Sequence, residues 1–393
     1  GRGERHFGWR YGRAQGVGSL KDARIENDLT GSSRSDRSQP NLELIVACQA
    51  ASNASDRRRH FLIPSHDVLD DPFFGWKYLV ESGLGAHSSI LSHTPQTAPG
   101  FRAGYLDRVE QHKLNINGIG INVRSFGDPA DPVLLLFHGW PDSGRCWAKV
   151  APLLADRYRV LVPDLRGFGE SDAPSDLESY RMPVLLGDVA GLIDWAGGGP
   201  AFVAGHDFGG ALTWQVATWL GDLVQRVVVM AAPHPLRMRE VGAGNVEQLS
   251  RSFYVWLMQA GGAGLDLLGS QDFALLAGFA FGGSSGFTAE DIEVYRADWR
   301  RPGRFAAMAN WYRAHFRPEL FNADIPLELP RVQIPVRYIH GEFDTAFASG
   351  METGSGSFVD AEFDEHTIAG ASHWMPQEKP NEVAALIADW MER

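Results

Sequence analysis

Three side chains in the second half of the chain, Asp207, Asp344 and His373, have the types and the chain order that nucleophilic catalysis requires. Asp207 stands in the segment GHDFGG, between a run of residues typical of a buried strand and a run typical of a helix. The glycines two residues on either side, Gly205 and Gly209, allow a turn so sharp that strand and helix nearly touch. The carboxylate would then project beside the positive end of the helix, which favours its ionised form.

An aspartate at such a turn implies a particular chemistry. A carboxylate with a reference pKa of about 3.9 is already ionised at neutral pH, so it needs no base to activate it, unlike a serine. It suits displacement at a saturated carbon, as in an epoxide or an alkyl halide. The product would be an ester of Asp207, which water must then cleave.

His373 is the candidate base for that second step. It lies in the segment GASHW after the last predicted strand, where it could activate the water that hydrolyses the ester. Asp344, in HGEFDTAF after the preceding strand, is expected to hold the imidazole in the right tautomer. Glu342, in the same segment, is the competing carboxylate.

Backbone groups near an apolar strand complete the candidate site. The segment His138-Gly139-Trp140-Pro141 ends that strand. The N–H groups of Trp140 and Phe208 could converge on the carbonyl oxygen of the ester. We expect His138 and Pro141 to support the motif by shaping the loop, together with Gly139.

These residues must be positioned by a sheet. From Tyr105 to Pro233, strand-like apolar runs alternate with helical patterns, which predicts a mostly parallel sheet flanked by helices. Alternation around Asn117-Gly118 predicts a β-hairpin at the start. Residues 144–158 have helical spacing. The fold class expected is therefore α/β.

The strand pattern stops after Pro233 and resumes near residue 334. The residues between are helical and rich in aromatic side chains, so we predict a helical lid at 235–328, inserted between two parts of the core at 104–234 and 329–393. Residues 1–103 lack sustained periodicity and are predicted to be disordered or non-native. The chain begins at Gly1 and its first methionine is Met182, which we interpret as a fragment, a processed form or a translation begun at the wrong place.

Composition limits the partners. The 393 residues carry a formal net charge of −12, which argues against nucleic acid and anionic membranes and is typical of a cytoplasmic enzyme. The longest apolar run near the start, Leu44–Ala47, is too short for membrane insertion. Cys48 and Cys146 indicate neither a disulfide framework nor a metal site, and no metal or cofactor is expected. A homodimer is compatible with the sequence.

Taken together, the segments HGWPDS, DLRGFGESDAP, GHDFGG, HGEFD and GASHW resemble those of the epoxide hydrolases of the α/β-hydrolase superfamily. The resemblance covers roughly residues 105–393 and implies an α/β-hydrolase fold with an inserted lid. It implies hydrolysis of an epoxide to a vicinal diol, with a small apolar epoxide and water as the reactants. One departure is Phe208, where many members have tryptophan.

The resemblance extends into the predicted lid. Two lid tyrosines of epoxide hydrolases bind the epoxide oxygen, and one often occurs in the pattern N-W-Y-R, here Asn310 to Arg313. The other often precedes a glutamine by five residues, as Tyr254 precedes Gln259. The resemblance therefore implies that Tyr312 and Tyr254 donate a hydrogen bond or proton to the opening ring. Tyr295 is a weaker substitute.

Three other functions are compatible with parts of this pattern. A haloalkane or haloacid dehalogenase shares the aspartate and the histidine, but dehalogenases usually have tryptophan or arginine where this chain has Phe208. A non-catalytic small-molecule receptor would not need an intact set of Asp207, Asp344 and His373. A serine esterase is disfavoured because no serine occupies the turn.

Overall fold

The computed structural model describes residues 109–316 and 328–393. The predictions for residues 1–103 and for the last part of the predicted lid lie outside the described residues.

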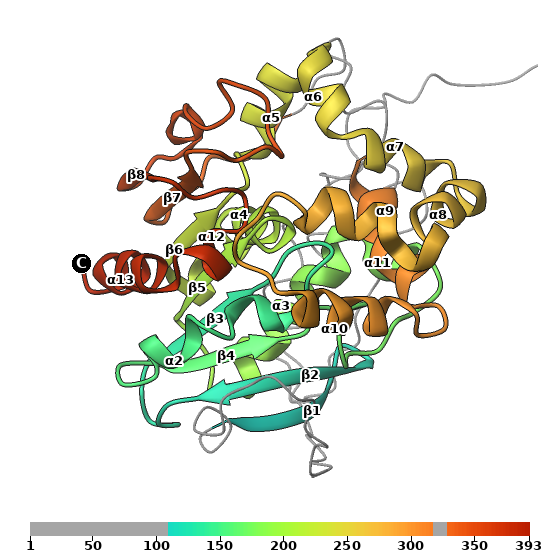
Figure 1. The fold of residues 1–393 in the computed structure, drawn as a ribbon. Helices are drawn as coiled ribbons and strands as arrows, with labels where there is room; N and C mark the ends of the chain where they lie inside the picture. The colour runs from blue at the N-terminus through green and yellow to red at the C-terminus, as the bar shows by residue number, and fades with distance from the viewer. Residues whose placement is uncertain (1–108, 317–327) are drawn as a thin grey trace, which may run out of the picture. The chain divides into compact units, whose positions relative to one another are not determined.

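The centre of the described protein is one mixed sheet of eight strands in the order β1-β2-β4-β3-β5-β6-β7-β8 (Figure 1). Strand β2 is antiparallel to both its neighbours, and every other pair is parallel. The strands are β1 (Glu110–Ile116), β2 (Ile119–Phe126), β3 (Val133–Phe137), β4 (Arg159–Pro163), β5 (Ala201–His206), β6 (Val224–Met230), β7 (Val336–Gly341) and β8 (Phe363–Ile368). The predicted mostly parallel sheet is thus confirmed.

The first two strands form the predicted hairpin. Asn117 and Gly118 occupy its turn with φ of 51° and 81°, the left-handed conformation that a two-residue turn between twisted strands requires. Asparagine tolerates this conformation better than most residues, and glycine adopts it freely.

Helices cover both faces of the sheet. Side chains of α3 (Met182–Trp195) and α4 (Phe208–Trp219) pack in the core on one face. Side chains of α2 (Ala151–Leu154), α12 (Met375–Glu378) and α13 (Pro380–Met391) pack on the other.

The helical pattern expected over residues 144–158 is realised only in part. The chain forms a 3-10 turn at Gly144–Trp147 and then the short helix α2, with Pro152 in its first turn. Proline has no N–H with which to continue a helix that began at Gly144, so a new helix begins at Ala151 with Pro152 in its first turn.

Between β6 and β7 the described chain is helical. It forms α5 (Pro235–Gly242), α6 (Val246–Arg251), α7 (Phe253–Gln259), α8 (Gly262–Leu268), α9 (Ser270–Phe281), α10 (Ala289–Trp299) and α11 (Arg304–His315) (Figure 1). Two indoles join this segment to loops that follow strands. Trp299 Nε1 donates to the Pro141 carbonyl after β3 at 3.0 Å, and Trp311 Nε1 donates to the Arg166 carbonyl after β4 at 2.8 Å. The helical segment therefore lies at the carboxyl ends of these strands.

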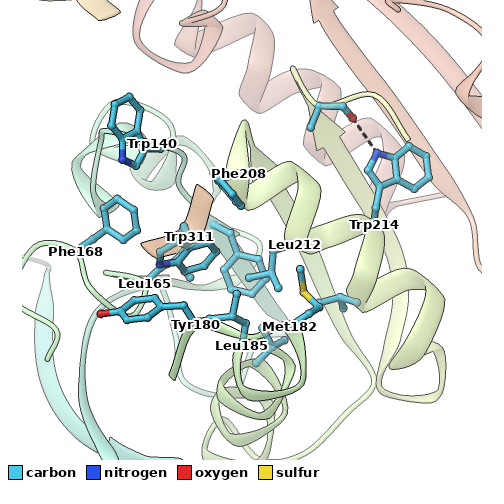
Figure 2. Close-up of a cluster of buried hydrophobic side chains, with 14 of the residues drawn as sticks. Trp140, Leu165, Phe168, Tyr180, Met182, Leu185, Phe208, Leu212, Trp214 and Trp311 are labelled. Atoms are coloured by element: carbon cyan, nitrogen blue, oxygen red, sulfur yellow. Dashed lines mark hydrogen bonds between the residues drawn. The ribbon is translucent and has the colours of Figure 1, made fainter. Parts of the chain in front are cut away.

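Trp311 also fills the core beneath the site. Figure 2 shows its indole lying between Phe208 of α4 and the loop that carries Phe168. The ring centroids of Trp311 lie 5.2 Å from Phe208 and 5.7 Å from Phe168, both edge to face. Such aromatic pairs stabilise a fixed arrangement, so α11 is held with Tyr312, the next residue, in a defined place.

Candidate active site

The turn that carries Asp207 is as tight as the sequence predicts. Asp207 joins β5 to α4 with φ 54° and ψ −118°, a strained conformation for a residue other than glycine. A Cβ on Gly205 would lie 2.1 Å from the Gly209 carbonyl oxygen, and a Cβ on Gly209 would lie 2.4 Å from the Phe137 carbonyl oxygen. Only glycine fits at both positions, which leaves the Asp207 side chain projecting from the turn.

The loop after β3 binds the Asp207 carboxylate. The Trp140 N–H donates to Asp207 Oδ1 at 2.6 Å. A Cβ on Gly139 would lie 2.4 Å from Asp207 Cβ, so glycine is required for this close approach. Phe208 is the first residue of α4, and its N–H is one of those that a helix leaves without an internal partner. The Phe208 N–H stays a predicted second donor to the carbonyl oxygen of the ester.

His373 lies between two carboxylates. Its Nδ1 is 2.9 Å from Asp344 Oδ2, and its Nε2 is 3.4 Å from Asp207 Oδ2. Burial alone would lower the pKa of His373, but the charges and hydrogen bonds of Asp344 and Asp207 raise it to about 10. Burial alone would likewise raise the pKa of each aspartate, and His373 instead holds both below the ordinary value. The free site is therefore an imidazolium between two carboxylates.

The two candidate carboxylates after β7 have different partners. Asp344 faces His373, and its Oδ1 also accepts the Ala346 N–H at 2.8 Å. Glu342 Oε2 instead accepts the Gly370 N–H at 2.8 Å. The structure therefore brings Asp344, and not Glu342, to the imidazole.

His138 and Pro141 lie in the supporting loop. His138 is buried, and burial lowers its pKa to about 4. Its neutral ring donates from Nδ1 to the Gly139 carbonyl at 2.9 Å and accepts the Leu165 N–H at Nε2 at 3.0 Å. The Trp140–Pro141 peptide is cis. The histidine thus links the loops that follow β3 and β4.

The two predicted tyrosines meet. Tyr254 of α7 and Tyr312 of α11 have their hydroxyl oxygens 3.3 Å apart. The indole of Trp140 stacks on Tyr254 at 5.4 Å and meets Tyr312 edge-on at 5.3 Å. Since the Trp140 N–H binds Asp207, the tyrosines and the triad belong to one site. Burial keeps both phenols protonated by raising their pKa values.

Gln259 joins the helices that carry the tyrosines. Its Nε2 donates to the Tyr312 carbonyl at 3.0 Å and to the Phe316 carbonyl at 2.7 Å, across from α7 to the end of α11. Its spacing from Tyr254 is visible in the sequence, whereas its contacts appear only in the structure. Tyr295 lies elsewhere, buried against Asp142, with which it shares a hydrogen bond.

The described residues include neither a metal-binding cluster nor a membrane-spanning helix. No group of three or more histidine, cysteine, aspartate or glutamate side chains in the described ranges is arranged to hold a metal ion. Among helices of the described part, none is both long and apolar enough to cross a bilayer.

The charged triad makes stability depend on pH. The pKa of His373 is 6.5 in an unfolded chain and about 10 in the fold. Protonated His373 therefore stabilises the folded protein fully below pH 6.5, and this contribution is lost as the pH rises toward 10. We expect the free energy of unfolding in urea to fall between pH 7 and pH 10, and to fall less in His373→Gln. Equal slopes for the two proteins would contradict this charge assignment.

Comparisons with known proteins agree with the geometry. The family model of the α/β hydrolase fold matches residues 132–380. Epoxide hydrolase 3 of Xenopus tropicalis is 31% identical over 71% of this chain and 77% of its own length. AB hydrolase superfamily protein YfhM of Bacillus subtilis is 33% identical over 73% of this chain and 99% of its own. The crystal structure of Bacillus megaterium epoxide hydrolase in complex with an inhibitor is 28% identical, with a TM-score of 0.65 over 72% of this chain and 100% of that one. The chain therefore belongs to the α/β-hydrolase-fold family and, within it, to the epoxide hydrolases.

Proposed function

We propose that this protein hydrolyses an epoxide to a vicinal diol through a covalent ester on Asp207. The single observation that carries the proposal is the pair of hydroxyls of Tyr254 and Tyr312, 3.3 Å apart, in the same site as the Asp207 carboxylate. Two neutral donors side by side suit one oxygen atom on which negative charge develops.

The first step opens the ring. An oxygen of the Asp207 carboxylate attacks one ring carbon, and the bond between that carbon and the epoxide oxygen breaks. One tyrosine hydroxyl gives its proton to the departing oxygen while the other donates a hydrogen bond. The products are an ester of Asp207, bearing the new hydroxyl group, and a tyrosinate.

Ester formation changes the state of His373. The pKa of its imidazole is about 10 in the free site because both Asp207 and Asp344 are anionic beside it. The ester is neutral, so the pKa of His373 falls, and its proton can return to the tyrosinate. The neutral imidazole is then a base, while Asp344 keeps its Nδ1 protonated.

The second step cleaves the ester. His373 Nε2 takes a proton from water as that water attacks the ester carbonyl carbon. The N–H groups of Trp140 and Phe208 receive the oxyanion. The intermediate collapses, His373 returns the proton to the departing alcohol oxygen, and the diol leaves. The carboxylic acid of Asp207 then gives its proton to His373, which restores the charged free site. One oxygen of Asp207 is now the oxygen of water, and one oxygen of the diol is the former oxygen of Asp207.

We further propose that the helices α5–α11 act as a lid, in the domain arrangement 104–234, 235–328 and 329–393. Lid helices supply both tyrosines, and Trp299 and Trp311 bind the lid to the loops after β3 and β4. The substrate is a small apolar epoxide, because aromatic rings pack against the two tyrosine rings: Trp140, Phe208, Phe279 and Phe316. A cytoplasmic location fits the net charge of −12.

Turnover of styrene oxide, measured beside a short 1-chloroalkane, tests the function. We expect phenylethanediol from the epoxide and no chloride release. A dehalogenase must stabilise a halide ion that leaves, and Phe208 offers no side-chain donor for it. Chloride release without diol formation would make dehalogenation the function.

A further inference from the structure

His206, the residue before Asp207, is a buried titratable group that the proposed reaction does not use. It is the last residue of β5 and is fully buried. Successive strand residues alternate between faces, so His206 lies on the face of Phe202 and Ala204, which pack in the core with α2 and α13. Its imidazole therefore lies beside the site and does not meet the substrate.

The contacts of the ring define its protonation state. His206 Nε2 is 2.7 Å from the backbone carbonyl oxygen of His373, and Nδ1 is 4.0 Å from Cys146 Sγ. A carbonyl oxygen only accepts hydrogen bonds, so Nε2 carries the hydrogen. Burial, with the charge of His373, lowers the pKa of His206 to about 4. The ring is thus neutral, with the bare Nδ1 facing the Cys146 thiol.

His373 depends on such support because of where it lies. It follows β8 and precedes α12, in a segment that is neither helix nor strand. The contact with Asp344 orients its ring. The hydrogen bond from His206 holds its main chain, and the two imidazole centroids lie 4.9 Å apart. Ring and backbone of the candidate base are therefore fixed by two different residues.

We propose that His206 is a positioning residue that fixes the main chain of His373 and thereby sets the place of its Nε2 relative to the ester of Asp207. This inference rests on the proposed function. Without the donor, the carbonyl of His373 would be left buried and without a hydrogen bond, which is unfavourable. The segment would move toward another partner, and the ring of His373 would move with it.

Loss of the hydrogen bond from His206 should affect ester cleavage and not ester formation. Attack by Asp207 on the epoxide does not use His373 as a base, whereas cleavage of the ester does. Loss of the His206 hydrogen bond should therefore slow ester cleavage and leave ester formation nearly unchanged. A residue needed only for folding would lower both rates together, or lower the amount of active enzyme.

Two substitutions of the same residue make a matched test. In His206→Gln the amide nitrogen reaches about as far from the backbone as Nε2, so it can still donate to the carbonyl. In His206→Asn the shorter amide cannot. With styrene oxide, we expect His206→Asn to accumulate the Asp207 ester, seen by mass spectrometry, with cleavage roughly ten-fold slower. His206→Gln should stay near the wild type. Cys146→Ala, which changes the other side of the ring, should also accumulate no ester.

Equal ester levels in His206→Asn and His206→Gln, or an equal fall of both half-reactions in His206→Asn, would overturn the proposal. If the wild type itself makes no diol, the proposed function fails instead, so the two failures are distinct. If His206→Asn is insoluble, a spectrum of the wild type labelled with ¹⁵N-histidine takes its place. His206, assigned by its loss in His206→Gln, should be neutral and protonated at Nε2 from pH 5.5 to pH 9. Protonation at Nδ1 would exclude the hydrogen bond.

Discussion

Replacing His373 by glutamine should stop the reaction at the covalent ester. Asp207 would still be held by the Trp140 N–H and able to attack the epoxide, but no base would activate the water, a role worth roughly 10²–10⁴-fold in rate. Mass spectrometry of the intact protein should show the mass of one substrate molecule added to nearly every chain. Diol release should be a small fraction of the wild-type rate from the first turnover on, because each diol must be released from the ester.

The matched control is Asp207→Ala. It removes the attacking oxygen, so neither ester nor diol should form. Together the two variants separate attack from cleavage. If His373→Gln releases diol at the wild-type rate, His373 is not the base. An adduct in Asp207→Ala would place the nucleophile on another residue.

The second large effect concerns the tyrosine pair. Tyr254→Phe and Tyr312→Phe should each slow ester formation roughly ten-fold or more, the size usual for assistance by a general acid. The double variant should be nearly inactive on epoxides, because the hydroxyls lie 3.3 Å apart and either can partly serve the oxygen alone. Cleavage of the ester, measured after rapid alkylation, should not change in the single variants.

Tyr180→Phe serves as the control for that pair. Tyr180 is a buried tyrosine whose hydroxyl donates to the Pro174 carbonyl at 2.7 Å, outside the site. Its loss should leave ester formation unchanged. Normal single-turnover rates in both Tyr254→Phe and Tyr312→Phe would remove the main reason to prefer epoxides over alkyl halides.

Local rules of the chain made much of this site predictable. The turn at Asn117-Gly118, the glycines around Asp207 and the alternation of strands and helices each follow from short-range steric and hydrophobic patterns. The position of His373 after the last strand also places it near Asp207, because parallel strands end at one edge of a sheet. We predicted from the sequence that Asp344, and not Glu342, orients the imidazole of His373, and the structure places Asp344 at that imidazole.

Other features depend on contacts between distant segments, which no local pattern encodes. His206 belongs to the segment GHDFGG, in which the sequence pattern points only to Asp207. Its hydrogen-bond partner is the backbone carbonyl of His373, 167 residues away. Gln259 binds backbone carbonyls on another helix. The break of the helix expected at 144–158 did have a local signal, because Pro152 cannot continue a helix that began earlier.

The central claim, that Asp207 is the nucleophile, is tested most directly by following oxygen through a single turnover. With enzyme in excess over styrene oxide in heavy-oxygen water, the water attacks the ester carbonyl, so its oxygen should enter the carboxylate of Asp207. The first diol should be unlabelled, and the peptide that contains Asp207 should gain the heavy oxygen. Label found in that first diol, with none in the peptide, would mean that water attacks the epoxide itself and that Asp207 is at most a base.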